Sequence, residues 1–165
     1  TSQSSQRQQE RLQFLSFRDM LTGLYNRNKY MKVLETFEKY PVCDTGVAYI
    51  DLNGLKQIND NLGHEAGDRL LCDAAKEILR TFPENSYRIG GDEFCVLLRE
   101  PEKEELCKEK FFWVMEKRRK VVSILPFVSY GSAELLEQES IRDTKARADQ
   151  KMYEDKKEHK ERKGR

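Results

Sequence analysis

Two apolar segments separated by a glycine pair constrain the fold of this chain more than any other feature. Tyr87–Ile89 and Glu93–Leu98 both have the composition of short strands, and Gly90 and Gly91 stand between them. Strand segments joined by so short a connection predict a β-hairpin, and hence an antiparallel sheet. Glycines in such a turn permit positive φ and allow a phosphate to approach the backbone closely.

The hairpin also carries two carboxylates, and a third ends another predicted strand. Asp92 and Glu93 follow the glycines directly, and Gly46–Asp51 is an apolar run that predicts a buried strand ending on an acid. If this strand lies beside the hairpin, the three acids converge, and such a cluster is costly unless a divalent cation neutralises it. Carboxylate oxygens are the ligands that Mg²⁺ prefers. Taken alone, however, the glycines and acids also suit an ordinary turn, and Asp51 also suits a helix cap.

The remaining segments predict helices that cover the sheet. Asn26 can cap a helix that runs to about Tyr40. Further helices are expected at about 54–61, 64–82, 101–120 and 140–159, and a further strand at 122–130. This order predicts an α+β fold with a central, mostly antiparallel sheet covered by helices. A length of 165 residues suits one domain of this kind.

The first residues predict a separate N-terminal element. Residues 1–9 are rich in Ser and Gln and have the character of a frayed end or of the remnant of a longer helix. Leu12, Leu15 and Met20 then form an apolar stripe that is typical of a helix. This helix is either the end of a signalling stalk or a capping helix that lies on the domain. We therefore assign residues 1–18 to an extension and residues 19–165 to the main domain.

Composition argues against several functional classes. The chain has 30 basic and 29 acidic residues, a net charge of +1, and so lacks the global field that recruits nucleic acid or anionic membranes. Its four cysteines include no C-x-x-C pair, which argues against a zinc site or a disulfide framework. No segment has the length of a membrane span or the pattern of a secretion signal. We expect a cytoplasmic domain, although the full-length protein could be membrane-tethered.

A second polar constellation lies at residues 59–68, N-D-N-L-G-H-E-A-G-D. Asn59 and Asp68 stand at its two ends, in a glycine-bracketed turn between two predicted helices. Guanine presents the donors N1–H and N2–H₂ beside the acceptor O6, so that a carboxylate with an amide complements it. Read alone, both are ordinary helix-boundary residues. His64 in the same turn is more simply structural, because no second histidine is placed to share a metal with it.

Five ordered blocks of the sequence resemble GGDEF-domain diguanylate cyclases. They are D-M-L-T-G-L-Y-N-R at 19–27, I-D-L-N-G-L-K-Q-I-N-D-N-L-G-H-E-A-G-D-R-L at 50–70, R-I-G-G-D-E-F at 88–94, S-Y-G-S-A at 129–133 and A-D-Q-K-M-Y-E-D-K at 148–156. The resemblance implies a fold similar to nucleotidyl cyclases and polymerase palm domains. It also implies a nucleotidyltransferase of bacterial signalling that condenses two GTP into cyclic di-GMP and pyrophosphate across a homodimer, controlled by an upstream sensory domain.

The resemblance assigns roles to individual residues. It implies that Asp51, Asp92 and Glu93 hold two Mg²⁺ ions, or Mn²⁺, in each half-site, with the carbonyl of Leu52 as a further ligand. The implied catalytic residues are the same Asp92 and Glu93, together with Lys56 near the phosphates. Of these, Asp92 stands at the family position that comes closest to the role of a general base. The implied substrate-binding residues are Asn59 and Asp68 at guanine, together with Gly54, Leu55, Gly90, Gly91, Lys156 and Lys160.

Several positions depart from the family pattern. Asn53 and Leu55 replace a frequent aspartate and phenylalanine, and Lys160 replaces an arginine, which keeps the charge but loses the planar fork. The family's product-binding R-x-x-D is here Thr81-Phe82-Pro83-Glu84, so we expect that inhibitory site to be absent. The segment 101–129 is also shorter than is usual in the family.

Three alternatives remain beside the cyclase. A catalytically silent GTP-binding or interaction module would keep the fold, but such members commonly lose the acids that are present here. A Walker-type NTPase is disfavoured because the sequence contains no G-x-x-x-x-G-K-[ST]. An enzyme that makes a mixed GMP/AMP dinucleotide is disfavoured by Asp68, since adenine lacks the donor pair that a carboxylate accepts from.

Overall fold

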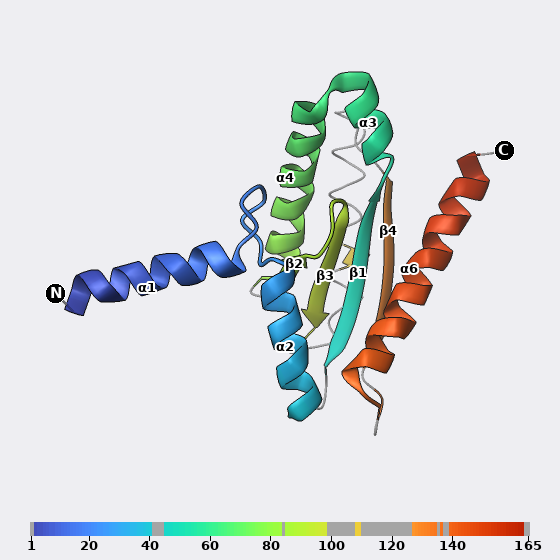
Figure 1. The fold of residues 1–165 in the computed structure, drawn as a ribbon. Coiled ribbons are helices and arrows are strands. Elements are labelled where there is room, and N and C mark those ends of the chain that lie inside the picture. Colours follow the sequence, from blue (N-terminus) through green and yellow to red (C-terminus); the bar gives the residue numbers. More distant parts are fainter. Residues whose placement is uncertain are drawn as a thin grey trace.

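Four strands form the centre of the computed structural model, which describes residues 2–40, 45–83, 85–98, 108–109, 127–134, 136 and 139–163 (Figure 1). In the sheet, β2 (Ser86–Arg88), β3 (Glu93–Leu98), β1 (Gly46–Asn53) and β4 (Phe127–Glu134) lie side by side in that order. Every pairing is antiparallel. The structure thus confirms the predicted α+β class, its antiparallel central sheet and its hairpin.

The register of the sheet brings the hairpin tip to the end of β1. Asp51 lies opposite Glu93 on β3 and opposite Ser129 on β4. The predicted end of the first strand at Asp51 was wrong: β1 continues to Asn53, because its last residues still pair with the start of β4. The last strand also differs from its expected range of 122–130. It continues to Glu134, which pairs with Gly46, and residues 121–126 lie outside the described residues.

Helices cover both faces of the sheet, as the strand alternation requires. On one face, α3 (Leu55–Leu62) and α4 (His64–Thr81) form a core with the inward residues of β1 and β3; its members include Ile50, Leu52, Leu71, Ala75, Ile78 and Phe94. On the other face, α2 (Arg27–Lys39) and α6 (Ile141–Lys163) pack against the alternate side chains; this core includes Tyr30, Val47, Tyr49, Cys95, Ala148 and Met152. Asp51 and Glu93 lie two residues from Tyr49 and Cys95, so the alternation of side chains places both acids on this second face of the sheet.

A glycine sets the distance between α6 and the sheet. A Cβ atom on Gly131 of β4 would overlap backbone atoms of Met152 and Ala148 and would lie 2.7 Å from the carbonyl carbon of Lys151. In the same region, the Asp155 carboxylate accepts a hydrogen bond from the backbone N–H of Tyr130 (2.9 Å). The helix therefore rests directly on the backbone of β4, and its register against that strand is defined.

The N-terminal helix α1 (Ser2–Phe17) projects away from the rest of the molecule (Figure 1). None of its residues is buried, and Leu12 and Leu15 of the predicted apolar stripe are exposed. The helix is therefore not a cap that lies on the domain, and it begins well before Leu12. The division at residues 18 and 19 stays a prediction.

The other predicted helices agree with the structure where it describes them. Asn26 caps α2 by accepting from the backbone N–H of Lys29 (3.1 Å). The last helix was expected to end at about 159 and continues to Lys163. The predicted helix 101–120 lies outside the described residues apart from 108–109. Among the described residues, no helix is both long and apolar enough to cross a membrane.

Candidate active site

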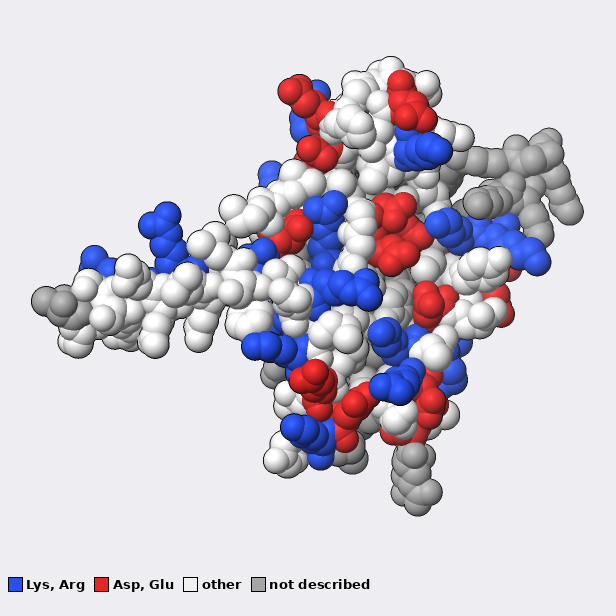
Figure 2. Space-filling view, viewed as in Figure 1, with Lys and Arg blue, Asp and Glu red and all other residues white. Residues whose placement is uncertain are grey.

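Three carboxylates meet where β1 and β3 come together. Asp51, Asp92 and Glu93 each offer an oxygen, and these oxygens all lie within 4.8 Å of one another. The backbone N–H of Leu52 donates to the carbonyl oxygen of Asp92 (3.0 Å), which ties the hairpin tip to β1. Figure 2 shows acidic side chains gathered in this region, with basic side chains on both sides. The three acids therefore converge, as the sequence predicted for the case that the first strand lies beside the hairpin.

The cluster fits a hard divalent cation. Asp51 is only 2% exposed, and its Oδ1 is buried without a hydrogen-bond partner among the described residues. Burying a carboxylate oxygen without a partner is costly, and a bound cation removes that cost. The cluster is open on its other side, because Glu93 is exposed and Asp92 is half-buried.

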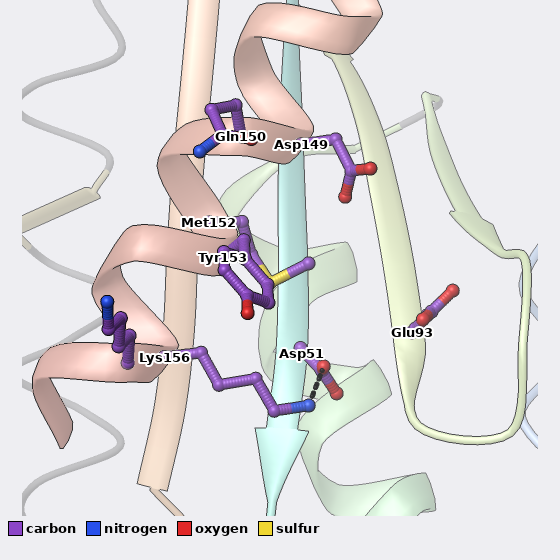
Figure 3. Close-up of a pocket in the computed structure, with 8 residues that line it drawn as sticks. Asp51, Glu93, Asp149, Gln150, Met152, Tyr153 and Lys156 are labelled. Carbon is purple, nitrogen blue, oxygen red and sulfur yellow. Dashed lines mark hydrogen bonds and ion pairs between the residues drawn. The ribbon is translucent and has the colours of Figure 1, made fainter. Parts of the chain in front are cut away.

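Lys156 of α6 reaches across to the same cluster. Its Nζ lies 2.7 Å from Oδ2 of Asp51, and the two side chains are 32% and 3% exposed (Figure 3). Burial raises the pKa of the Asp51 carboxyl. The hydrogen bond from Lys156 opposes this rise, and the charges of Asp92 and Glu93 add to it. The same hydrogen bond raises the pKa of Lys156. The family resemblance implied that Lys156 binds substrate, and the structure shows it as the ion-pair partner of the buried Asp51.

The two glycines of the hairpin leave space at different places in the site. Neither Gly90 nor Gly91 has a positive φ, although glycine permits one; the loop runs from the end of β2 at Arg88 to the start of β3 at Glu93. A Cβ on Gly90 would come to 3.1 Å from Oε2 of Glu93, so this glycine makes room for the acid. A Cβ on Gly91 would meet no heavy atom within 4 Å, which leaves the backbone there open to a ligand.

An ion pair links the hairpin loop to the segment that follows α1. Arg88 donates from Nε and Nη2 to the carbonyl oxygen of Gly91 (3.3 and 2.9 Å) and from Nη1 to Asp19 (3.1 Å to Oδ2). Asp19 also accepts from the N–H and the hydroxyl of Thr22. Partial burial opposes ionisation of Asp19, but the hydrogen bonds from Thr22 and Arg88 outweigh it and lower its pKa. Sequence reasoning missed this pair, although both residues stand in the blocks quoted above.

We expect Asp19→Asn to destabilise the protein by about 1.5–3 kcal/mol at pH 7, the usual worth of hydrogen bonds to a charged group. Because the folded pKa of Asp19 is lowered, its stabilisation is present above the ordinary value of 3.8 and is lost as the pH falls through the folded value. Urea unfolding at pH 7, 5 and 3 should therefore show the difference from wild type shrinking toward pH 3. Glu35→Gln, which alters an exposed acid on α2, serves as the control. A difference that did not change with pH would contradict the ion-pair explanation.

The guanine-type pair lies across the junction of α3 and α4. Gly63 joins these helices with a φ of 89°, a left-handed value that favours glycine. The Asn59 side chain lies against Gly67, where a Cβ would overlap it, and its Oδ1 is buried without a partner among the described residues. Asp68, the next residue along α4, is exposed. The amide of α3, whose oxygen lacks a partner among the described residues, thus lies against the residue of α4 that precedes the exposed carboxylate of Asp68.

The chain has the sequence pattern of a known family over most of its length. The family model described as "Diguanylate cyclase, GGDEF domain" matches residues 16–162. This chain belongs to that family. It is 41% identical over 85 residues to the probable diguanylate cyclase DgcJ of Escherichia coli (strain K12), and 40% identical over 94 residues to the cyclic di-GMP phosphodiesterase PdeR of the same organism. These matches cover 48% and 55% of this chain but only 17% and 14% of those proteins.

Solved GGDEF structures have the same fold. The diguanylate cyclase SiaD of Pseudomonas aeruginosa, solved in complex with its activator SiaC, superposes with a TM-score of 0.74 at 26% identity, over 95% of this chain and 64% of that one. The coiled coil and GGDEF domain of DgcB from Caulobacter crescentus superposes with a TM-score of 0.79 at 24% identity, over 94% of this chain and 88% of that one.

Further residues that the sequence analysis named in this GGDEF domain lie on α3, α4 and α6. Gly54, with a φ of 85°, is the N-cap residue of α3, in which Leu55 packs against the core and Lys56 is exposed. Lys160 lies on α6, but its side chain is outside the described part of the chain. The hydroxyl of Thr81 donates to the carbonyl oxygen of Glu77 (2.8 Å). Glu84 lies outside the described residues, so the loss of the inhibitory site stays a prediction.

A pocket of about 520 Å³ adjoins the carboxylates on the α6 side (Figure 3). Its lining consists of the acids of β1 and β3 and one side of α6: Asp51, Glu93, Asp149, Gln150, Met152, Tyr153, Lys156 and Lys157. Sequence reasoning did not single out Asp149 or Tyr153. Their signal was present, because both belong to the A-D-Q-K-M-Y block of the GGDEF pattern.

Proposed function

We propose that this GGDEF domain is an active diguanylate cyclase, which condenses two GTP into cyclic di-GMP and pyrophosphate. Family membership supports cyclic di-GMP synthesis in general. The observation that carries the proposal for this chain is the carboxylate cluster, in which oxygens of Asp51, Asp92 and Glu93 lie within 4.8 Å of one another beside an open glycine backbone. Silent members of the family would not need to retain this arrangement.

The cluster is the proposed metal site. Asp51, Asp92 and Glu93, with the carbonyl oxygen of Leu52, would hold Mg²⁺, or Mn²⁺ in its place. When bound, the metal supplies charge neutralisation at the phosphates and acidifies the attacking hydroxyl. Asp92 is the proposed acceptor for the proton of the 3′-hydroxyl, because it stands at the hairpin tip beside the open backbone of Gly91.

The remaining residues position the substrate in this proposal. Asp68 accepts from N1–H and N2–H₂ of guanine, and Asn59 has a buried amide oxygen that still lacks a donor among the described residues. Lys56, Lys156 and Lys160 contact the phosphates. The backbone of the protein also contacts the substrate, at the start of α3 and in the hairpin loop; the residues are Gly54, Leu55, Gly90 and Gly91.

Each subunit holds one GTP, so we propose that the reaction takes place across a homodimer. Two bound substrates facing each other on a two-fold axis gain an effective molarity on the order of 10⁵ M or more when they are well oriented. Residues 1–18 would be the control element in front of a catalytic domain at 19–165. Leu12 and Leu15 of α1 are exposed and suit contact with a second helix. Through such a contact, an upstream sensory domain would control dimerisation.

The direct test is to incubate the protein with GTP and Mg²⁺ and to identify the products by mass. Cyclic di-GMP and pyrophosphate are expected. Tight GTP binding with no product would identify a silent binding module instead, and a mixed GMP/AMP product in the presence of ATP would identify the related dinucleotide enzyme.

Base selectivity provides a second test. Asp68→Asn should lower the preference for GTP over ATP by about 10–100-fold, because an amide cannot accept from both N1–H and N2–H₂ and a lost hydrogen bond to a charged group is worth about 1.5–3 kcal/mol. The measurement is competitive binding of the two nucleotides. Glu65→Gln, at an exposed acid in the first turn of the same helix, should leave the preference unchanged. An unchanged preference in Asp68→Asn would place the base elsewhere.

A further inference from the structure

We propose that Lys156 competes with the metal ion for Asp51, so that the metal and the nucleotide bind as a coupled pair rather than independently. This inference rests on the proposed function and adds an order to its binding steps. Lys156 is thus a positioning residue with two successive partners, first the Asp51 carboxylate and then a phosphate of the substrate.

The contact itself carries the first step. The ammonium of Lys156 lies 2.7 Å from Oδ2 of Asp51, whose side chain is only 3% exposed. The other oxygen, Oδ1, has no partner among the described residues. Asp51 therefore has one oxygen ready for a cation while the other is held by Lys156, and a metal ion at the cluster places a second positive charge against that ammonium.

The fold delivers Lys156 to this position. Its neighbour Asp155 accepts a hydrogen bond from the backbone N–H of Tyr130, and the residue before Tyr130, Ser129, is the direct partner of Asp51 across the sheet. Gly131 brings α6 onto the strand at the same place. The ion pair is therefore not the chance contact of a long surface side chain: the turn of α6 that carries Lys156 is fixed one strand away from Asp51.

A coupling between metal and nucleotide follows from this geometry. The metal ion and the ammonium of Lys156 both bind the Asp51 carboxylate. A metal ion that binds alone must therefore displace the ammonium or bind against the repulsion between the two positive charges. A nucleotide that arrives with the metal offers Lys156 its phosphate oxygens in exchange. Linkage then requires that nucleotide strengthen metal binding and that metal strengthen nucleotide binding by the same factor.

The test measures Mn²⁺ binding to the whole chain without nucleotide. Binding is detected by calorimetry and by the electron paramagnetic resonance signal of free Mn²⁺. Lys156→Met should bind Mn²⁺ about tenfold more tightly than wild type, within the range usual for coupled sites. Lys157→Met is the matched control, since it removes the same charge from the next position of α6, on the same pocket. Lys156→Arg, which keeps a cation, should bind Mn²⁺ nearly as weakly as wild type.

The second arm adds a non-hydrolysable GTP analogue. In wild type the analogue should tighten Mn²⁺ binding, and in Lys156→Met this gain should shrink by about the same tenfold factor. Two results without nucleotide would overturn the inference, provided that thermal unfolding shows each variant folded: Mn²⁺ binding in Lys156→Met that is unchanged or undetectable, or Mn²⁺ binding that tightens as much in Lys157→Met as in Lys156→Met. Tighter Mn²⁺ binding with no cyclic di-GMP formed by wild type would refute the proposed activity and leave this inference standing.

Discussion

Replacing Asp92 by Asn, or Glu93 by Gln, is expected to abolish cyclic di-GMP formation. Either change withdraws a carboxylate from the group whose oxygens lie within 4.8 Å of one another. Metal ions in such sites supply several kcal/mol of charge stabilisation, and about 1.4 kcal/mol changes a rate tenfold, so the loss should be about a thousandfold or more. The measurement is the initial rate of product formation from GTP in the presence of Mg²⁺.

Stability separates this effect from a loss of fold. Removing one of three neighbouring acids relieves repulsion in the metal-free protein, so the midpoint of thermal unfolding should stay the same or rise. Asp60→Asn, at an exposed acid on α3, should change neither the rate nor the midpoint. Normal turnover in both Asp92→Asn and Glu93→Gln would remove the metal assignment.

Features that depend on neighbouring residues could be predicted from the sequence. The hairpin follows from apolar segments on both sides of Gly90 and Gly91, and the cap of α2 follows from Asn26. The turn between α3 and α4 follows from Gly63 in the same way. In each case the signal and the structure lie within a few residues of each other, so that local backbone preference decides the outcome.

Contacts between distant segments could not be predicted in this way. Lys156 and Asp51 are 105 residues apart, and Arg88 and Asp19 are 69 apart, so neither pair produces a periodic pattern. Likewise, the sequence placed the end of the first strand at Asp51 because the apolar run ends there. The strand continues because β4 supplies a partner for its backbone, and only the assembled sheet shows that partner.

Gly131→Ala is expected to be the most destabilising of the small substitutions at glycine. The added methyl group would overlap backbone atoms of Met152 and Ala148, and backbone cannot rotate away as a side chain can. Forcing extra volume into such a contact costs about 1–3 kcal/mol, or the helix must move off the strand. Movement of α6 would also withdraw Lys156 from Asp51. Urea unfolding gives the stability, and Mn²⁺ binding shows whether the ion pair was lost with it.

Gly91→Ala is the matched control, because it makes the same chemical change where a Cβ would meet no heavy atom within 4 Å. Its φ is outside the left-handed region, so an alanine fits the backbone and the unfolding free energy should stay near that of wild type. GTP should nevertheless bind more weakly, since the methyl group would stand on the open backbone that we propose for the phosphate. Equal stability of Gly131→Ala and wild type would mean that α6 does not rest on β4 this closely, and the placement of Lys156 at Asp51 would lose its structural cause.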